Sequence, residues 1–227
     1  MGKVITMDFL EKYDIHIVNK DLLMQALTHS SYTNEHKDEG VKSVHYERLE
    51  FLGDAVLQLL MSDYLFNHMH VKEGEMSKLR ASYVCAEACR HYADRIGYIP
   101  YIRVGKGQIK DINDTIIADI FESILGCIYL DQGYSKAKSL FDQVVIPYVE
   151  SDEKFIVDYK SKLQELVQTE KKSLEYKVVN ETGLSNDKTF EVIVSVDGII
   201  YGKGTGKSKK MAEQNAAKDA YSKQAKI

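Results

Sequence analysis

"HYERLEFLGDAVL", residues 45–57, places three carboxylates inside one of the more apolar parts of the chain. With about 100° per residue, Glu47, Glu50 and Asp54 fall within roughly 60° of one another on a helix and form one acidic stripe. The rest of the circumference is mostly apolar: Leu49, Phe51, Leu52, Ala55, Val56, Leu57, Leu59 and Leu60. We therefore expect a helix over 46–68 that lies at the centre of its domain.

"IIADIFESILGCIYL", residues 116–130, carries a second acidic pair, Asp119 and Glu122, in an equally apolar setting. Ionised carboxylates that are partly buried side by side are costly unless a cation compensates them. Two such pairs predict a site for a hard cation, and ligands that are all oxygen favour Mg²⁺ or Mn²⁺ over zinc. In the alternative interpretation, each pair is the solvated edge of an amphipathic helix.

Two chemistries use carboxylate-bound metals in helical proteins. Di-iron bundles combine Glu with a His three residues later, whereas the residues three after Glu47 and Asp119 are Glu50 and Glu122. This difference argues against redox chemistry. It favours phosphoryl transfer, in which a metal lowers the pKa of an attacking water and stabilises charge on the leaving oxygen.

The charge of the chain is divided unevenly along its length. Residues 1–154 hold 17 Lys and Arg against 24 Asp and Glu, a net charge of −7, whereas residues 155–227 hold 13 against 10, a net charge of +3. This asymmetry indicates two units with different partners. A length of 227 residues is sufficient for two modest domains in a soluble globular protein.

Nothing in the sequence indicates a membrane span or a secreted protein. No window holds the roughly 18 consecutive apolar residues of a span, and acidic residues occupy the N-terminal region where a signal peptide has its apolar core. The three cysteines give neither a disulfide framework nor a zinc spacing. We therefore expect a cytoplasmic protein with no membrane partner.

The first part of the chain is typical of an all-α domain, predicted over residues 1–150. Apolar residues recur at helical spacing in 21–29, 46–68, 76–97 and 115–133. Gly97 and Gly133 are predicted to end helices. We expect no strand of any length before residue 174.

The second part, residues 155–227, is typical of an α+β domain with the order helix, three strands, helix. A helical pattern over 155–168 precedes strands at 174–181, 189–196 and 199–206, and a last helix follows at 207–223. Asp197-Gly198 predicts a tight hairpin turn. Lys207, Lys209 and Lys210 oppose the dipole at the start of the last helix, so we expect phosphates to bind there; in the alternative interpretation they are solvated surface.

Taken together, these segments resemble a known family. "HYERLEFLGDAVL", "ALTHSSYTNE", "EGEMSKLRASYV" and "ADIFESILGCIYLDQG" resemble the signature segments of bacterial ribonuclease III, and "GKGTGKSKKMAEQNAAKDAY" resembles a double-stranded RNA-binding domain. The resemblance implies an all-α ribonuclease III endonuclease domain followed by an α-β-β-β-α RNA-binding domain. It implies a homodimer through the catalytic domain that cuts double-stranded RNA to 5′-phosphate and 3′-hydroxyl ends, in rRNA and mRNA processing.

The resemblance also assigns roles to individual residues. It implies that Glu50, Asp54, Asp119 and Glu122 are catalytic, and that Glu50, Asp119 and Glu122 bind Mg²⁺, for which Mn²⁺ can substitute. Glu47 and Glu73 match auxiliary acidic positions. The residues implied to bind RNA meet a minor groove or phosphates and read duplex shape rather than sequence: Ser161, Gln164, Glu165, Lys207, Lys209 and Lys210.

Four features depart from the family pattern. Tyr46 replaces a usual Asn, Leu184 replaces a proline, and Asn186 stands at the position of a His. Residues 105–115 lack the usual glycine pair and basic residue, and they include Asp111 and Asp114. Weaker contact by the loop around Leu184 is therefore expected.

Three classes of function are compatible with these observations. The chain is a metal-dependent nuclease for double-stranded RNA, an RNA-binding protein that has lost catalysis, or a scaffold in a ribonucleoprotein. The complete set of four carboxylates favours the nuclease, because neither of the other two classes needs acidic residues in an apolar core.

Overall fold

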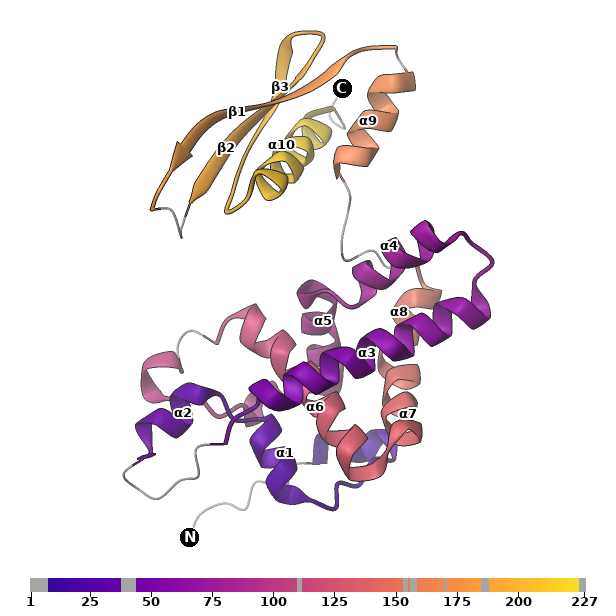
Figure 1. The fold of residues 1–227 in the computed structure, drawn as a ribbon, viewed down its shortest axis with the longest axis vertical. Helices are drawn as coiled ribbons and strands as arrows, with labels where there is room; N and C mark the ends of the chain where they lie inside the picture. Colours follow the sequence, from indigo (N-terminus) through magenta and orange to yellow (C-terminus); the bar gives the residue numbers. More distant parts are fainter. Residues whose placement is uncertain are drawn as a thin grey trace. The chain divides into compact units, whose positions relative to one another are not determined.

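The computed structural model describes residues 8–37, 44–109, 112–152, 155, 159–169, 171–184 and 188–224. The chain divides into two compact units, Met1–Ile156 and Val157–Ile227 (Figure 1). Asp111 and Asn186 lie outside the described residues. No helix in the described ranges is both long and apolar enough to cross a membrane.

The first unit is helical, as predicted. Its elements are η1 (Asp8–Tyr13), α1 (Lys20–Ala26), α2 (Ser30–Glu35), α3 (Glu47–His68), α4 (Glu73–Tyr83), α5 (Ala86–Ile96), η3 (Ile99–Tyr101), η4 (Lys106–Gln108), α6 (Asp114–Gln132), α7 (Tyr134–Val144) and α8 (Ile146–Glu150). The bridge between Thr28 and Arg103 is the one extended pairing among the described residues of this unit.

Glycine ends two of these helices at the predicted positions. Gly97 follows α5 with a φ of 84°, and Gly133 follows α6 with a φ of 82°, values that side chains rarely adopt. The periodic run 76–97 is divided into α4 and α5, because the backbone is extended at Cys85 (φ −77°, ψ 161°). The helical period alone did not reveal this break.

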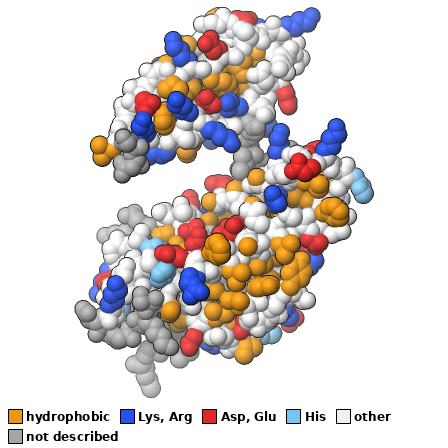
Figure 2. Space-filling view, viewed as in Figure 1, with side chains coloured by type: hydrophobic (Ala, Val, Ile, Leu, Met, Phe, Trp, Pro, Cys, Tyr) orange, Lys and Arg blue, Asp and Glu red, His pale blue; other side chains and the backbone are white. Residues whose placement is uncertain are grey.

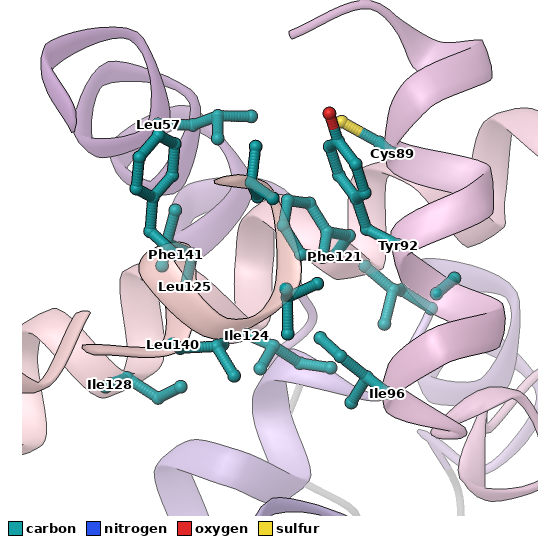
Figure 3. Packing of buried hydrophobic residues seen from close by; sticks show 14 of the residues in the cluster. Leu57, Cys89, Tyr92, Ile96, Phe121, Ile124, Leu125, Ile128, Leu140 and Phe141 are labelled. Atoms are coloured by element: carbon teal, nitrogen blue, oxygen red, sulfur yellow. The ribbon is translucent and has the colours of Figure 1, made fainter. Parts of the chain in front are cut away.

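The central helix of the first unit is α6. Most of its side chains are buried, and α1, α3, α5 and α7 pack around it. Figure 3 shows Phe121, Ile124 and Leu125 of α6 between residues of the neighbouring helices. The expectation that α3 lies at the centre was wrong, because Phe51 and Phe66 of α3 are 81% and 75% exposed. One side of α3 is packed, whereas the other presents apolar residues to solvent.

The second unit has the predicted order of elements. It consists of α9 (Tyr159–Thr169), β1 (Leu174–Thr182), β2 (Thr189–Val196), β3 (Ile199–Gly206) and α10 (Lys209–Gln224). The antiparallel sheet has the order β1-β2-β3. Asp197 and Gly198 both have positive φ (48° and 79°), as expected for a tight hairpin turn.

Helices α9 and α10 form the core of the second unit with the sheet. Leu163 and Val167 of α9 are buried with alternate residues of β2 and with the small side chains of α10: Val192, Val194, Val196, Ala212, Ala216, Ala217 and Ala220. Leu166, which the sequence places near the same helical face, is 37% exposed. The alternation along β2 therefore sets which face of the sheet the helices cover.

Candidate active site

Four carboxylates from two helices meet in the first unit and are called the acidic cluster: Glu50, Asp54, Asp119 and Glu122. The first two lie on the opening turns of α3, and the other two lie on α6. All four are half-buried. The fold therefore brings together, from two helices, the four carboxylates that the family resemblance implied to be catalytic.

Close contact between α3 and α6 holds the two pairs together. A Cβ atom added at Gly53 would lie 1.7 Å from the main-chain oxygen of Glu122, and one added at Gly126 would lie 2.4 Å from that of Leu49. Neither position can hold a side chain without separating the helices. Because Gly53 lies next to Asp54 and touches the backbone of Glu122, this contact sets the spacing within the acidic cluster.

The electrostatics of the acidic cluster show uncompensated negative charge. Burial, followed by repulsion from the other three carboxylates, raises the pKa of Glu122 to about 8. The pKa of Glu50 is raised by burial and then by its acidic neighbours, foremost Asp119. Burial also raises the pKa of Asp119, although a hydrogen bond from Tyr46 opposes this shift. These shifts favour the protonated forms of the carboxyl groups, most of all that of Glu122, when no cation is bound nearby.

Three uncharged side chains contact the acidic cluster, and one of them is the Gln58 amide, which donates to Oδ1 of Asp54 at 3.3 Å. The hydroxyl of Tyr46 donates a hydrogen bond to Oδ2 of Asp119 at 3.0 Å, and the thiol of Cys89 donates a weak one to Oε1 of Glu122 at 4.0 Å. The sequence analysis treated Tyr46 only as a departure from the family pattern and assigned no role to Cys89. The signal in the sequence was the position of Tyr46 directly before the acidic stripe. Its contact with Asp119 depends on how α6 packs, which the sequence does not show.

The donor set fits a hard divalent cation. All four members of the acidic cluster offer oxygen atoms, the ligands that Mg²⁺ and Mn²⁺ prefer. No Lys or Arg among the described residues pairs with any of them. No three His, Cys, Asp or Glu side chains in the described ranges are already arranged as a metal site. A cation would therefore have to draw these carboxylates together as it bound.

The two auxiliary acidic residues lie in different places. Glu47 is exposed at the start of α3, where it lies 3.6 Å from Nδ1 of His45 and raises the pKa of Glu50. Glu73 begins α4 and accepts a hydrogen bond from Ser77 at 2.9 Å. About 20 Å of helix separates Asp54 from the far end of α3, so Glu73 does not join the acidic cluster within one copy.

The segment around residues 105–115 is partly explained by the fold. Asp114 begins α6 and forms an ion pair with Nε of Arg90 at 3.0 Å. Asn113 caps the same helix by accepting a hydrogen bond from the backbone of Ile116 at 2.9 Å. Asp114 therefore has a structural partner, which accounts for an acidic residue in a segment that would otherwise be expected to be basic.

In the second unit, the predicted RNA-binding residues of α9 share one surface. Ser161, Gln164 and Glu165 line an open hollow of about 350 Å³ together with Lys160 and Tyr176. The Lys160 ammonium forms an ion pair with Glu213 at 2.6 Å and lies 4.8 Å from the centre of the Tyr176 ring. The hollow thus presents polar side chains that are held partly in place.

The three predicted phosphate-binding lysines are exposed at the start of α10. Lys207, Lys209 and Lys210 flank the first turn, which Ser208 caps by accepting a hydrogen bond from the backbone of Met211 at 3.2 Å. A capped helix start with three lysines is well suited to an anion. Leu184 is 76% exposed. Its side chain is therefore available for a contact from the loop but is not held in one position.

Comparisons with known proteins match both units. A family model described as Ribonuclease-III-like matches residues 19–149, and one described as double-stranded RNA binding motif matches residues 159–224. Proteins named Ribonuclease 3 are similar over most of both chains. The one from Listeria monocytogenes is 46% identical and covers 90% of this chain and 91% of its own; the one from Streptococcus pneumoniae is 46% identical and covers 93% of each.

Solved structures agree with the sequence comparison. Two structures of the nuclease domain of ribonuclease III from Campylobacter jejuni have TM-scores of 0.56 and 0.57 at 31% and 30% identity. They cover 62% and 64% of this chain and 96% of their own. Since the family model spans more than half of the sequence and the relatives align along nearly all of it, this chain belongs to the ribonuclease III family.

Proposed function

We propose that this chain, an endoribonuclease by its family, hydrolyses double-stranded RNA with the help of Mg²⁺ and leaves 5′-phosphate and 3′-hydroxyl ends. The observation that carries the proposal is the acidic cluster, whose four carboxylates pair with no Lys or Arg in the part of the chain that the structure describes. Mn²⁺ can replace Mg²⁺, since both accept oxygen ligands. Action on rRNA and mRNA and a cytoplasmic location stay predictions, and so do the domain limits 1–150 and 155–227.

In this proposal, Glu50, Asp119 and Glu122 hold the metal, and Asp54 completes the catalytic set. The chemistry that the ion would supply when bound is activation of a water and stabilisation of charge on the leaving oxygen. Glu122 would have to be ionised to serve as a ligand, and a nearby cation would favour that form against the burial and acidic neighbours that raise its pKa. Burial of the four side chains strengthens their attraction to the ion by lowering the local dielectric.

The test of the proposal is a cleavage assay on a perfect RNA duplex of about 30 base pairs, which exceeds the roughly 16 that one binding domain spans. The purified chain is incubated with the labelled duplex in Mg²⁺, in Mn²⁺ and in EDTA. We expect cleavage with either metal only, and products that carry 5′-phosphate. Tight binding without cleavage in both metals would instead identify an RNA-binding protein that has lost catalysis.

We also propose that the chain forms a homodimer through the exposed side of α3. Phe51, Leu59 and Phe66, called the apolar stripe, are 81%, 56% and 75% exposed. Figure 2 shows hydrophobic side chains gathered over α3 and α7. Large exposed apolar patches mark interaction sites, and the Campylobacter jejuni nuclease domain has a region involved in dimer formation.

A second copy would also give Glu73 a role. In a twofold dimer the same surface meets itself, so the Phe66 end of one apolar stripe lies against the Phe51 end of the other when the helices run antiparallel. This arrangement carries the start of α4 in one copy towards the acidic cluster of its partner. Glu73 then acts beside Glu47 as an auxiliary acid in substrate handling or metal hydration.

Leu59→Lys is expected to weaken or abolish the dimer, because a charge in the middle of the apolar stripe would be buried without a partner. The measurement is the mass in solution by sedimentation or light scattering, with Leu166→Lys in the second unit as the matched control. Leu166 is also exposed and apolar, but it belongs to α9 of the second unit and not to the apolar stripe. A Leu59→Lys variant that keeps the mass of a dimer would contradict this interface.

Removal of the second unit should weaken duplex binding while leaving weak cleavage. A chain ending at residue 154 loses the net positive part of the sequence, and the nuclease domain of a relative forms a structure by itself. We expect cleavage to fall strongly at physiological salt and to recover partly at low salt, since phosphate contacts weaken as salt rises. Full activity of the shortened chain at physiological salt would overturn these roles.

A further inference from the structure

We propose that Tyr46 is a positioning residue, whose hydroxyl fixes the carboxylate of Asp119 for metal binding. This inference rests on the proposed function and concerns the same site. The hydroxyl donates to Oδ2 of Asp119 at 3.0 Å, which leaves Oδ1 of that carboxylate available as a ligand. Partners that hold a metal ligand in one orientation commonly contribute a tenfold or larger factor to metal affinity.

Tyr46 is suited to this role because its own position is fixed by three elements. Its backbone N–H donates to the carbonyl of Thr28 just beyond α1 at 2.9 Å, and its carbonyl accepts from the N–H of Glu50 in α3 at 2.9 Å. The hydroxyl reaches α6 through Asp119. The side chain is only 4% exposed, so water competes little for this hydrogen bond.

The ring of Tyr46 is held as firmly as its backbone. Its centre lies 5.7 Å from that of the His29 ring, with the two planes tilted by 40°. His29 is itself fixed at the start of α2, where Nδ1 accepts a hydrogen bond from the backbone of Ser31 at 3.1 Å. A phenol fixed in this way restricts the rotation of the Asp119 carboxylate. Without that hydrogen bond, repulsion among the carboxylates of the acidic cluster would tend to move them apart.

Tyr46→Phe separates positioning from packing, because it keeps the buried ring and removes only the hydroxyl. The matched control is Tyr13→Phe. The Tyr13 hydroxyl also makes one hydrogen bond, to the main-chain oxygen of Arg95 at 2.9 Å, and it touches no member of the acidic cluster. Asp119→Asn serves as the variant that damages the metal site directly.

The first measurement is the binding of Mn²⁺ to the full chain without RNA, followed by the electron paramagnetic resonance signal of the free ion. We expect the dissociation constant for Mn²⁺ to rise about tenfold in Tyr46→Phe and to stay within about twofold in Tyr13→Phe. Cleavage by Tyr46→Phe should need more metal but approach the normal rate at saturating Mn²⁺, with duplex affinity in EDTA unchanged. A loss due to packing alone would not be rescued by metal.

The outcomes distinguish this inference from the function on which it rests. An unchanged Mn²⁺ affinity in Tyr46→Phe, together with a loss in Asp119→Asn, overturns the role of Tyr46 alone. Failure of saturating metal to restore the rate of Tyr46→Phe also overturns it. If the unaltered chain binds no Mn²⁺ at millimolar concentration, the proposed metal site fails and the role of Tyr46 fails with it.

Discussion

Glu122→Gln is expected to reduce cleavage of duplex RNA on the order of a thousandfold while leaving RNA affinity nearly unchanged. The amide keeps the shape of the side chain but removes the charge from the most strongly perturbed member of the acidic cluster. The main-chain oxygen of Glu122 keeps its contact with α3. The measurement is the single-turnover cleavage rate in Mg²⁺ beside the duplex affinity in EDTA.

Glu87→Gln on α5 is the matched control for this variant. Glu87 is exposed and lies 3.8 Å from His91 one helical turn away, a surface pair that contributes little. We expect this control to cleave at the normal rate. Cleavage by Glu122→Gln at the normal rate in low millimolar Mg²⁺ would remove Glu122 from the mechanism and leave the acidic cluster without a function.

Gly53→Ala is expected to lower the free energy of unfolding by about 3 kcal/mol or more, through overpacking. The added methyl group would lie 1.7 Å from the main-chain oxygen of Glu122, so α3 and α6 must separate. Because the same contact spaces the acidic cluster, the fraction that still folds should also cleave poorly. Denaturant unfolding and the cleavage rate per folded molecule measure the two effects.

Gly74→Ala makes the same chemical change but is expected to have the opposite effect on the free energy of unfolding. Gly74 lies in α4, and nothing lies within 4 Å of a Cβ added there. Replacing a helical glycine with alanine in open space is expected to stabilise the protein by about 0.5–1 kcal/mol. If Gly53→Ala were as stable as Gly74→Ala, close contact between α3 and α6 could not be the feature that sets the site.

Local patterns in the sequence predicted most of the fold. The helical runs, the two glycine helix ends and the hairpin at Asp197-Gly198 all depend on near neighbours in the chain. The features that were not predicted include the break at Cys85, the exposed side of α3 and the helices α7 and α8. An apolar residue such as Phe51 can face the core of its own chain or the surface of a second copy. The helical period is the same in both cases, so periodicity cannot distinguish them.

The residues of the candidate site were easier to identify than their arrangement. Spacing grouped Glu47, Glu50 and Asp54 on one helix and Asp119 and Glu122 on another. The family resemblance selected four of these five residues, and the fold places those four together. How they meet depends on the packing of two helices that are distant in sequence. Glycines inside both helices were the available signal, since an interior glycine costs about 1 kcal/mol and therefore indicates a position where another backbone comes close.

Main-chain contact between α3 and α6 leaves the two helices of the acidic cluster without a hinge between them. Elements that open and close during turnover are usually joined by flexible connections and few packed contacts, whereas here each helix fills the space that a side chain of the other would need. The backbones that carry the two pairs are therefore held on a rigid frame, and only the carboxylate side chains would have to move when a cation binds. Slow steps of turnover should instead lie in the arrival and departure of the duplex, so that the affinity of the second unit, rather than motion in the first, would limit the release of products.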